Sequence, residues 1–388
     1  MQKFPIKNKR IRIKISIRSD AKKLRKKHRS RYILKVMNYE ISSLPSPNEI
    51  KTLLPLGKEE SLFIMKARKQ AIACLKRKDP RYVFFIGPCS IHEPNSLIEY
   101  CKLWKPLSLS LEKDFFLVLR FFTEKSRTQG GWKGFISDPL LDGSNNLHQG
   151  IIETRKLLLT LTQNGIPCAS EIVDPLLTPY FDDLLTWGFI GARSASSQVH
   201  RQHASKYDFP IGWKNSVDGN VDVAIQGAIN ASQKHVFPSI NQDGKISLFS
   251  SHGNPHTHIV LRGSTTHENY DLPSIHKVLQ KLYGYSFSRP LLIDCSHGNA
   301  QKDLKKQKKC FEEVLTYMTQ MPIFGMMLES FIYEGNQSLH QKPLTYGISV
   351  TDPCLSFETT AHLLLLAQKL LSSKEVCGRS MSTSFVQK

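Results

Sequence analysis

The chain contains eight short apolar runs, and each ends in a side chain that can bind a metal ion or an anion. Helix-length segments lie between most of these runs. This alternation predicts a (β/α)8 barrel, an α/β fold in which all strands point the same way. Because the carboxyl ends of barrel strands share one face, we expect the end residues to meet around a single mouth. In chain order they are Cys89, Arg120, Glu171, Arg193, Lys214, Arg262, His297 and Glu329.

The chain is longer than a bare barrel, which needs about 250 residues, so segments outside the barrel are expected in its 388 residues. Apolar residues at helical spacing between Glu59 and Lys76 predict a helix just before the first strand. The turn signal Asp243-Gly244 predicts an inserted hairpin. We therefore expect a basic leader (1–36), an extension of loop plus helix (37–80), a barrel (81–371) containing a hairpin (235–250), and a polar tail (372–388).

Positive charge is concentrated at the amino end. The formal net charge is +20, and residues 1–36 hold 15 Lys or Arg against the single acid Asp20, so the rest of the chain carries only +6. The leader is open to three interpretations: an arm for nucleic acid or an anionic membrane, a transit-type segment, or sequence upstream of a true start at Met37. A nucleic-acid function of the barrel is disfavoured, because a site for phosphate compounds explains the remaining charge.

Composition also limits where such a chain can work. Eight cysteines are scattered without a CxxC pair, which favours a reducing, cytoplasmic compartment in which most of them are small core residues. No apolar stretch approaches the roughly 20 residues that a membrane-spanning helix needs. The motifs GxSxG, GxGxxG and GxxxxGK[ST] are absent, so neither a hydrolase elbow nor a common nucleotide site is indicated.

Six cationic residues lie at or just beyond the predicted strand ends. Any one of them alone is better explained as a surface or salt-bridge residue. Together they predict a ligand with several negative charges, because gathering cations at one mouth is costly unless an anion offsets them. Gly130 and Gly131 would let the backbone approach such a ligand, and Thr128 adds a hydroxyl. The six cations are Arg120, Lys125, Arg127, Arg193, Lys214 and Arg262.

A second set could hold a metal ion. Cys89, His297 and Glu329 end the first, seventh and eighth strands, which are neighbours in a closed barrel, and Asp352 follows in YGISVTDP. Mixed soft and hard ligands suit Mn²⁺, Fe²⁺, Co²⁺ or Zn²⁺ better than Mg²⁺. Each residue also has an ordinary structural explanation: a core thiol, a hydrogen-bonded core histidine, or a partner for an arginine. Only the shared strand-end geometry favours the metal.

The motifs resemble one family along almost the whole span from about Asn48 to Leu371. The chain is similar to the type I 3-deoxy-D-arabino-heptulosonate 7-phosphate (DAHP) synthases, metal-dependent barrel enzymes that start the shikimate pathway to aromatic amino acids. They join phosphoenolpyruvate to erythrose 4-phosphate with release of phosphate. The matching segments are GPCSIHEP, LRFFTEKSRTQGGWKG, IGARSASSQVHR, GWKNSVDG, IVLRG, IDCSHGN, MLESFIYEGNQS and YGISVTDPC.

The resemblance implies a role for each candidate residue. The metal ligands would be Cys89, His297, Glu329 and Asp352. Phosphoenolpyruvate would be held by Arg120, Lys125, Arg193, Lys214 and Arg262, with help from the backbone of Gly191 and Ala192. Arg127 and Thr128 would bind the aldose phosphate, and Glu171 would lie beside the phosphoenolpyruvate. Lys125 is the first candidate proton donor to the aldehyde oxygen, and His297 is the second.

The sequence departs from the family pattern at four positions, none of which removes a charged group. Ser126 replaces a proline that would fix φ, Ser216-Val217 replaces glycine-threonine, and Pro353 replaces an alanine. Relatives are often inhibited by an aromatic amino acid, at a site built partly from the extension and the hairpin, and form homodimers or homotetramers. We expect the same here, with aldose affinity most affected by the changes.

Two other functions compete with this interpretation. A 3-deoxy-D-manno-octulosonate 8-phosphate synthase would share the barrel and the reaction but use arabinose 5-phosphate. The long extension, the hairpin and the pair Arg127-Thr128 favour the DAHP enzyme. A basic RNA-binding protein built on an inactive barrel is disfavoured, because an idle site has no need for such a costly group of charges.

Overall fold

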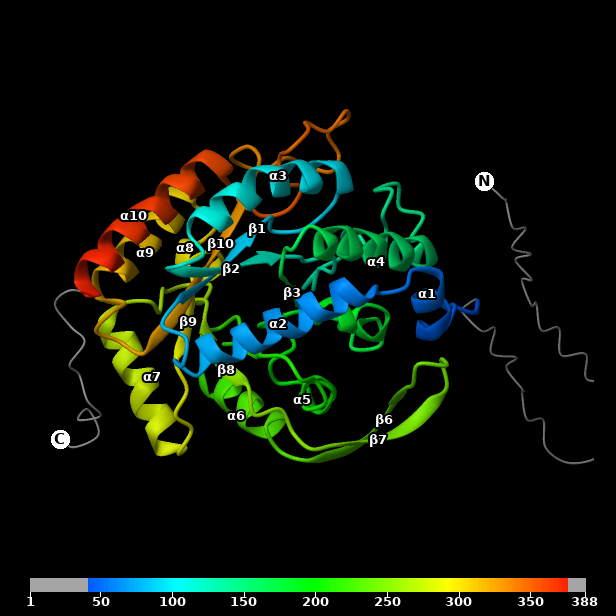
Figure 1. Cartoon of the computed structure of the whole chain (residues 1–388), viewed down its shortest axis with the longest axis horizontal. Coiled ribbons are helices and arrows are strands. Elements are labelled where there is room, and N and C mark those ends of the chain that lie inside the picture. Colours follow the sequence, from blue (N-terminus) through cyan, green and yellow to red (C-terminus); the bar gives the residue numbers. More distant parts are fainter. Residues whose placement is uncertain (1–40, 376–388) are drawn as a thin grey trace, which may run out of the picture. The chain divides into compact units, whose positions relative to one another are not determined.

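The barrel predicted from the sequence is present and closed. The computed structural model describes residues 41–375, and the compact unit begins at Ser46 (Figure 1). Eight strands pair in parallel, and β1 pairs with both β2 and β10, which closes the ring. In order around the barrel they are β1 (Tyr82–Gly87), β2 (Phe115–Arg120), β3 (Cys168–Glu171), β4 (Trp187–Ile190), β5 (Ile211–Lys214), β8 (Thr257–Leu261), β9 (Leu291–Asp294) and β10 (Ile323–Phe331).

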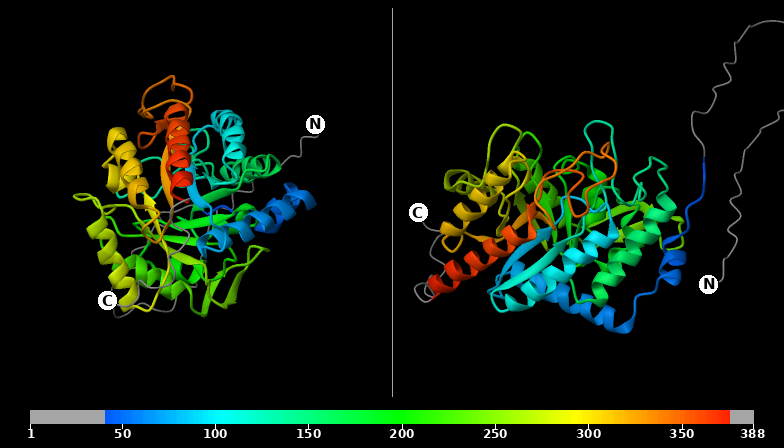
Figure 2. Two further views of the ribbon diagram at one scale, coloured as in Figure 1. Left: turned by 60° about the vertical axis from the view of Figure 1, so that its left-hand side comes forward. Right: turned by 90° about the horizontal axis from the view of Figure 1, so that it is seen from above.

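Helices alternate with these strands and cover the outside of the barrel (Figure 2). Four of them, α4, α5, α7 and α9, begin with a side-chain cap; Asp271 before α7 and Asp303 before α9, for example, each accept a backbone N–H of the first turn. The helices are α3 (Pro94–Ser110), α4 (Leu147–Gln163), α5 (Gln198–Ala204), α6 (Asp222–Ala231), α7 (Leu272–Gly284), α8 (His297–Ala300), α9 (Leu304–Tyr317) and α10 (Phe357–Glu375). Within residues 41–375, none is both long and apolar enough to span a bilayer.

The sequence of Pro179–Thr186 predicts a helix after the third barrel strand, and this prediction was wrong. The segment from Pro179 to Thr186 forms two 3₁₀ turns, η1 (Thr178–Tyr180) and η2 (Asp182–Leu184), because β4 begins directly afterwards and leaves no room for a longer helix. Helix α10 continues to Glu375, four residues beyond the expected barrel boundary at 371. The basic leader and the last thirteen residues of the expected tail lie outside the described residues.

The extension holds two helices instead of one. Helix α1 (Pro47–Leu53) begins with a capping box, in which the Ser46 hydroxyl accepts from Glu49 N at 3.2 Å and the Glu49 carboxylate accepts from Ser46 N at 2.6 Å. We expected only a loop here. The S-x-x-E spacing followed by the break at Pro55 is nevertheless a signal for a short helix.

Helix α2 (Lys58–Leu75) closes one end of the barrel. Its buried residues Ala71, Cys74 and Leu75 pack with barrel-interior side chains that include Val83 and Phe116, near the amino ends of their strands. This end is therefore filled with apolar side chains. The opposite end, where the strands finish, carries the loops; the orange loop after β10 and the teal loop after β2 rise on the same side in the right-hand view of Figure 2.

An antiparallel hairpin lies before the sixth barrel strand, where the sequence predicted it. Strands β6 (His235–Ile240) and β7 (Ile246–Ser251) pair from one end to the other, and Gly244 in the turn has a φ of 75°. The turn lies against α1, where Asn48 donates both its backbone N–H to Gln242 O (2.8 Å) and its side-chain amide to Asp243 (2.7 Å). The hairpin and the extension therefore form one contiguous feature of the barrel's outside (Figure 1).

Candidate active site

The strand-end residues lie where the prediction placed them, with small offsets. Arg120, Glu171 and Lys214 are the last residues of β2, β3 and β5. Glu329 lies inside β10, two residues before its end. The remaining four follow their strands by one to three residues: Cys89, Arg193, Arg262 and His297.

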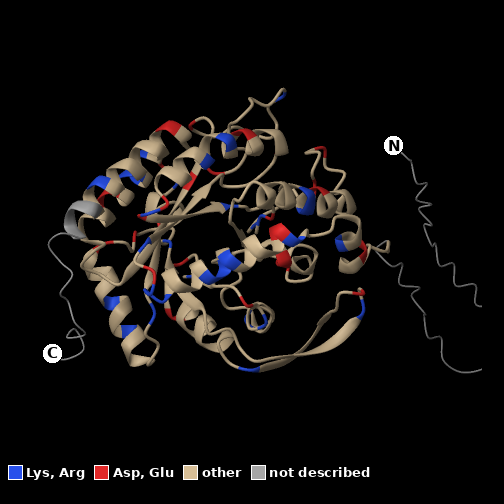
Figure 3. Ribbon diagram, viewed as in Figure 1, with Lys and Arg blue, Asp and Glu red and all other residues tan. Residues whose placement is uncertain are grey.

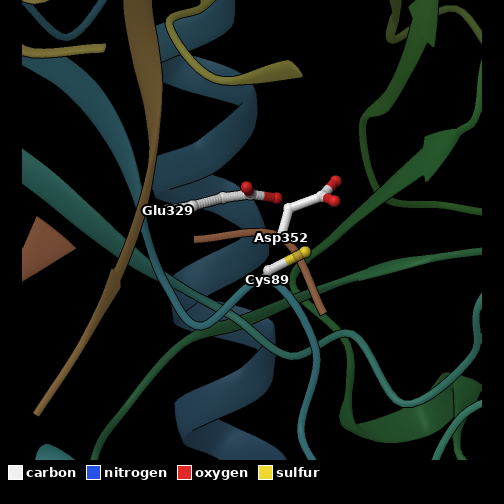
Figure 4. A group of neighbouring side chains, drawn as sticks. All are labelled: Cys89, Glu329 and Asp352. Carbon is white, nitrogen blue, oxygen red and sulfur yellow. The ribbon is translucent and has the colours of Figure 1, made fainter. Parts of the chain in front are cut away.

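Three of the four proposed metal ligands come together. One ligand atom each from Cys89, Glu329 and Asp352 lies within 4.8 Å of the other two, and the three side chains extend from separate segments into the same region (Figure 4). His297 lies at the edge of this group, with Nε2 3.5 Å from Glu329 Oε1. A thiol, two carboxylates and an adjacent imidazole fit a divalent transition metal, because they offer soft and hard donors from rigid elements.

His297 is held by an acid that the sequence analysis did not single out. Asp294, the buried last residue of β9, has Oδ2 2.9 Å from His297 Nδ1 and 2.9 Å from Lys214 Nζ. Burial alone would raise the pKa of Asp294. The neighbouring His297 and Lys214 nevertheless hold the pKa of Asp294 well below its usual range. His297 has a φ of 49°, a left-handed conformation uncommon for a non-glycine residue.

Glu329 is fixed from three directions. Its carboxylate accepts from Arg120 Nη2 at 3.0 Å, and Arg120 is fully buried. Its backbone N–H donates to Ser296 Oγ at 3.1 Å, and its carbonyl accepts from the Gln307 amide at 3.0 Å. Since Glu329 is itself buried, this network keeps its charge compensated and its orientation constant.

Lys125 lies against the thiol of the group. Its ammonium donates to Cys89 Sγ at 2.9 Å and to Cys89 O at 3.0 Å. Burial, together with the charge of Glu329, raises the pKa of Cys89 to about 11, against the influence of Lys125. Burial would lower the pKa of Lys125, but Cys89 and Glu329 raise it above its usual value. Lys125 is therefore a charged donor beside the group of Cys89, Glu329 and Asp352.

Other predicted binding cations lie close together at the strand ends. Arg120 and Lys214 lie over the Phe122 ring, at 4.2 Å and 5.8 Å from its centroid. Burial lowers the pKa of the Arg262 guanidinium, an effect that Asp294 opposes and Arg193 strengthens. Charges of both signs are spread over the barrel's outer helices (Figure 3). The candidate binding cations, in contrast, lie at or just after the strand ends.

The outer loops bring the predicted aldose-binding residues to the same rim. Arg193 Nε donates to Thr128 Oγ1 at 2.8 Å, which joins the loops after β4 and β2. Arg127 donates to Trp132 O at 2.9 Å within its own loop. Glu171 packs against the backbone of Gly191, where an added Cβ would lie 2.1 Å from Glu171 Oε1.

The departures from the family pattern have local structural consequences. Ser216 bonds to Asp218 and donates to Asn220 O at 3.2 Å, while Val217 O accepts from Thr265 N at 3.2 Å. These bonds brace a turn in place of a flexible glycine. Pro353 lines a small cavity together with His297, Glu329 and Asp352. Ser126 is half-buried, and nothing in the structure explains its presence.

The fold and this site define a (β/α)8-barrel enzyme with a metal-type ligand group set among anion-binding cations. The sequence profile of the DAHP synthetase I family matches residues 63–365. The chain belongs to that family and is a carbon–carbon bond-forming enzyme, a 3-deoxy-7-phosphoheptulonate synthase.

Named relatives agree along most of the length. The phospho-2-dehydro-3-deoxyheptonate aldolase, Tyr-sensitive, of Escherichia coli K12 is 39% identical over 325 residues, which are 83% of this chain and 91% of the relative. The Trp-sensitive aldolase of the same strain is 36% identical over 336 residues, covering 86% and 95%. A phospho-2-dehydro-3-deoxyheptonate aldolase structure from Francisella tularensis SCHU S4 superposes with a TM-score of 0.84 at 38% identity, covering 86% of this chain and 98% of that one.

Proposed function

We propose that the enzyme condenses phosphoenolpyruvate with D-erythrose 4-phosphate and water to give DAHP and inorganic phosphate, in a metal-dependent reaction of aromatic amino acid biosynthesis. The observation that carries the proposal is the close group of Cys89, Glu329 and Asp352 with Lys125 Nζ 2.9 Å from the thiol. A ligand group and a charged proton donor are thus adjacent, among cations suited to two phosphorylated substrates.

Cys89, His297, Glu329 and Asp352 would hold the divalent ion, Mn²⁺, Fe²⁺, Co²⁺ or Zn²⁺. Such an ion supplies Lewis-acid polarisation of the aldehyde carbonyl. Lys125 would donate the proton to the aldehyde oxygen as C3 of phosphoenolpyruvate attacks the carbonyl carbon, and His297 is the second candidate for this transfer. Asp294 would keep the His297 ring oriented throughout.

The cations would hold the two substrates in reacting positions. Arg120, Lys214 and Arg262, with Arg193 and the Gly191-Ala192 backbone, would bind the carboxylate and phosphate of phosphoenolpyruvate. Arg127 and Thr128 would bind the phosphate of the aldose. Glu171, packed on Gly191, would orient the water that adds at C2. Holding the two anionic substrates together accounts for most of the expected rate acceleration. Their translational and rotational entropy is then lost on binding and no longer adds to the barrier of the chemical step.

The test is phosphate release from the two substrates. Protein stripped of metal by a chelator should release no phosphate, and added Mn²⁺ should restore release only when both substrates are present. Cys89→Ala should abolish the restored activity. Cys101→Ala, which removes a buried thiol from α3, is the matched control and should remain active. Release that survives chelation or Cys89→Ala would refute the metal role.

The choice of aldose needs its own comparison. We expect turnover with erythrose 4-phosphate and none with arabinose 5-phosphate at equal concentration. Arg127→Met should raise KM for the aldose and leave KM for phosphoenolpyruvate unchanged, because Arg127 lies in the outer loop. Preferential turnover of arabinose 5-phosphate would overturn the assignment of the substrate but not that of the reaction type.

Feedback inhibition by an aromatic amino acid is part of the proposal, and the names of the Tyr-sensitive and Trp-sensitive relatives support it. A cavity of about 250 Å³ lies where the extension, the barrel and the hairpin meet. It offers aromatic walls and charges of both signs, which suits a zwitterion with an apolar side chain. Its lining residues are Arg68, Asp182, Asp183, Lys206, Tyr207, Asp208, Phe209, Gln242 and Phe249.

Adding phenylalanine, tyrosine and tryptophan separately to the phosphate-release assay tests this regulation. One of the three should inhibit, and Lys206→Ala should relieve the inhibition without lowering basal activity. Inhibition by none of them, or inhibition that Lys206→Ala leaves unchanged, would contradict the site.

A homodimer or homotetramer in the cytoplasm completes the proposal. The outward face of the hairpin exposes Val236, Pro238, Ile246 and Leu248, an apolar surface that a second copy would cover. Light scattering should give more than one chain per particle, and Ile246→Glu should reduce that number. The seven described cysteines are free and buried, which supports a reducing compartment.

A further inference from the structure

Each side chain of the close ligand group lies against its own cation. Cys89 Sγ is 2.9 Å from Lys125 Nζ, and Glu329 Oε1 is 3.0 Å from Arg120 Nη2. Asp352 Oδ1 is 3.0 Å from Lys302 Nζ. Neither the sequence motifs nor the proposed chemistry gave Lys302 a role.

Lys302 differs from the other two cations in its freedom to move. Arg120 is fully buried, and Lys125 bonds to both the thiol and the carbonyl of Cys89. The Lys302 side chain is 68% exposed, so its ammonium can leave Asp352 for solvent at little cost. The three contacts are therefore unequal, and the ion pair of Lys302 with Asp352 is the one that breaks most readily.

Lys302 lies in a stretch of left-handed backbone beside the ligand group. Gln301 and Lys302, which follow the short helix α8, both have left-handed φ values, 51° and 63°. Non-glycine residues adopt this conformation at an energetic cost. Lys302, His297, Glu329 and Asp352 line the same small cavity, so the ammonium lies on the wall that an entering ion would meet.

A divalent ion and this ammonium would compete for one carboxylate. A cation bound among Cys89, Glu329 and Asp352 would repel an ammonium that lies 3.0 Å from one of its ligands. The backbone of Asp352 is held independently of Lys302, because its carbonyl accepts from Ser349 Oγ at 2.8 Å. Competition should therefore outweigh any benefit of Lys302 in pre-orienting the carboxylate.

We propose that Lys302 is an exchangeable counter-ion: it pairs with Asp352 in the ion-free site, releases that carboxylate when the divalent ion binds, and thereby weakens metal affinity. This inference rests on the proposed metal site. Lys302 acts through Asp352, so it is a positioning residue, and metal binding itself is the quantity to measure.

The experiment measures Mn²⁺ binding to metal-stripped protein, by electron paramagnetic resonance of the free ion, for four proteins: wild type, Lys302→Met, Lys305→Met and Asp352→Asn. Lys302→Met keeps the aliphatic stem and removes the charge. It should bind Mn²⁺ about two- to fivefold more tightly, the change expected for an exposed ion pair. Lys305, another exposed lysine and the second residue of α9, is the matched control, and Lys305→Met should bind like wild type.

Salt gives a second readout. In about 0.5 M KCl the ratio of the two affinities should approach one, because an exposed pair is screened at that ionic strength. Equal or weaker binding by Lys302→Met at low salt would overturn the inference while leaving the proposed function intact, as would an equal gain in Lys305→Met. Wild-type protein that binds no Mn²⁺, or Asp352→Asn that binds like wild type, would remove the ligand set on which the inference depends.

Discussion

At the scale of single residues, Asp294 connects Lys214, a candidate substrate-binding residue, with His297, a candidate metal ligand. Its Oδ2 lies 2.9 Å from both Lys214 Nζ and His297 Nδ1, and the carboxylate is fully buried. A buried carboxylate between two cationic or hydrogen-bonding partners remains charged and holds both of them in fixed positions. The geometry of the mouth thus depends on a residue that would touch neither substrate nor metal.

Asp294→Asn should lower Mn²⁺ affinity about 10–100-fold, the usual effect of losing a carboxylate that orients a ligating histidine. Asparagine keeps the shape and removes the charge, so the fold should survive. Titration of metal-stripped protein with Mn²⁺ measures the change. Asp271→Asn is the matched control, because asparagine also caps helices well and the Asp271 side chain accepts from Ser274 N at the start of α7. Unchanged affinity in Asp294→Asn would show that His297 does not depend on its carboxylate partner.

Strand-end residues were predictable from the sequence, but their partners were not. Apolar runs locate Glu329 and Lys214 because strand alternation is a local pattern. The Asp294–Lys214 pair joins residues 80 positions apart, and the Lys302–Asp352 pair joins residues 50 apart, so neither leaves a local signal. Asp294 stood at the end of an apolar run, and its charge in that position was the available signal.

At the scale of elements, the seam between β1 and β10 depends on one small residue. A Cβ at Gly325 would lie 2.0 Å from Val83 O, a backbone atom that cannot move without disturbing the pairing of these strands. The ring closes only if β1 and β10 pair, so strain at this position acts on the whole barrel.

Gly325→Ala should therefore destabilise the protein by about 3 kcal/mol or more, the upper range for overpacking. Urea unfolding followed by circular dichroism measures the loss. Gly284→Ala at the end of α7, where an added Cβ meets nothing within 4 Å, should be neutral or slightly stabilising. If the two substitutions unfold at the same urea concentration, the contact with Val83 is not a constraint.

Arg155 joins several elements outside the barrel. From α4 it donates to Leu54 O at 2.8 Å, to Tyr180 O at 3.0 Å and to both carboxylate oxygens of Asp183 at 2.7 and 2.9 Å. It is fully buried, so removing its charge leaves these acceptors without their donor. The extension and the 3₁₀ turns are thus attached to α4 through one side chain.

Arg155→Met should cost about 3–5 kcal/mol of unfolding free energy, as expected when one partner of a buried pair is lost. Lys156→Met, at the next position and 64% exposed, should change stability by less than about 0.5 kcal/mol. Chemical denaturation of both variants provides the comparison. A small loss in Arg155→Met would mean that Lys51, 3.6 Å from Asp183, compensates for it.

Element types were predicted best where the pattern was long. Helix α2 and the strand β10 carry many periodic or apolar residues, so their type followed from the sequence. Helix α1 has seven residues, and its capping box at Ser46 was the only strong signal. The 3₁₀ turns at residues 178–184 had helical composition but too little length, a limit set by where β4 must begin.

At the scale of the whole molecule, several histidines are buried without charge. Burial lowers the pKa of His258 to about 3, and those of His92 and His203 to about 4. His258 lies inside the barrel, where its Nε2 accepts from Trp187 Nε1 at 2.9 Å. An unfolded chain protonates these groups near pH 6.5, whereas the folded protein does so only at much lower pH.

The unfolding free energy should therefore fall as the pH drops below about 6.5, because these histidines bind protons in the unfolded state but not in the folded state. For His258 the loss continues down to its folded pKa of about 3 and amounts to about 2 kcal/mol between pH 7 and pH 5. His258→Gln keeps an acceptor for Trp187 and cannot be protonated, so its unfolding free energy should fall by about 2 kcal/mol less than that of wild type over this interval. The exposed His276→Gln should follow the wild-type curve, and urea unfolding at pH 7, 6 and 5 measures all three. If the curve of His258→Gln runs parallel to wild type, the barrel interior does not exclude the proton, and acid sensitivity must come from the carboxylates at the mouth.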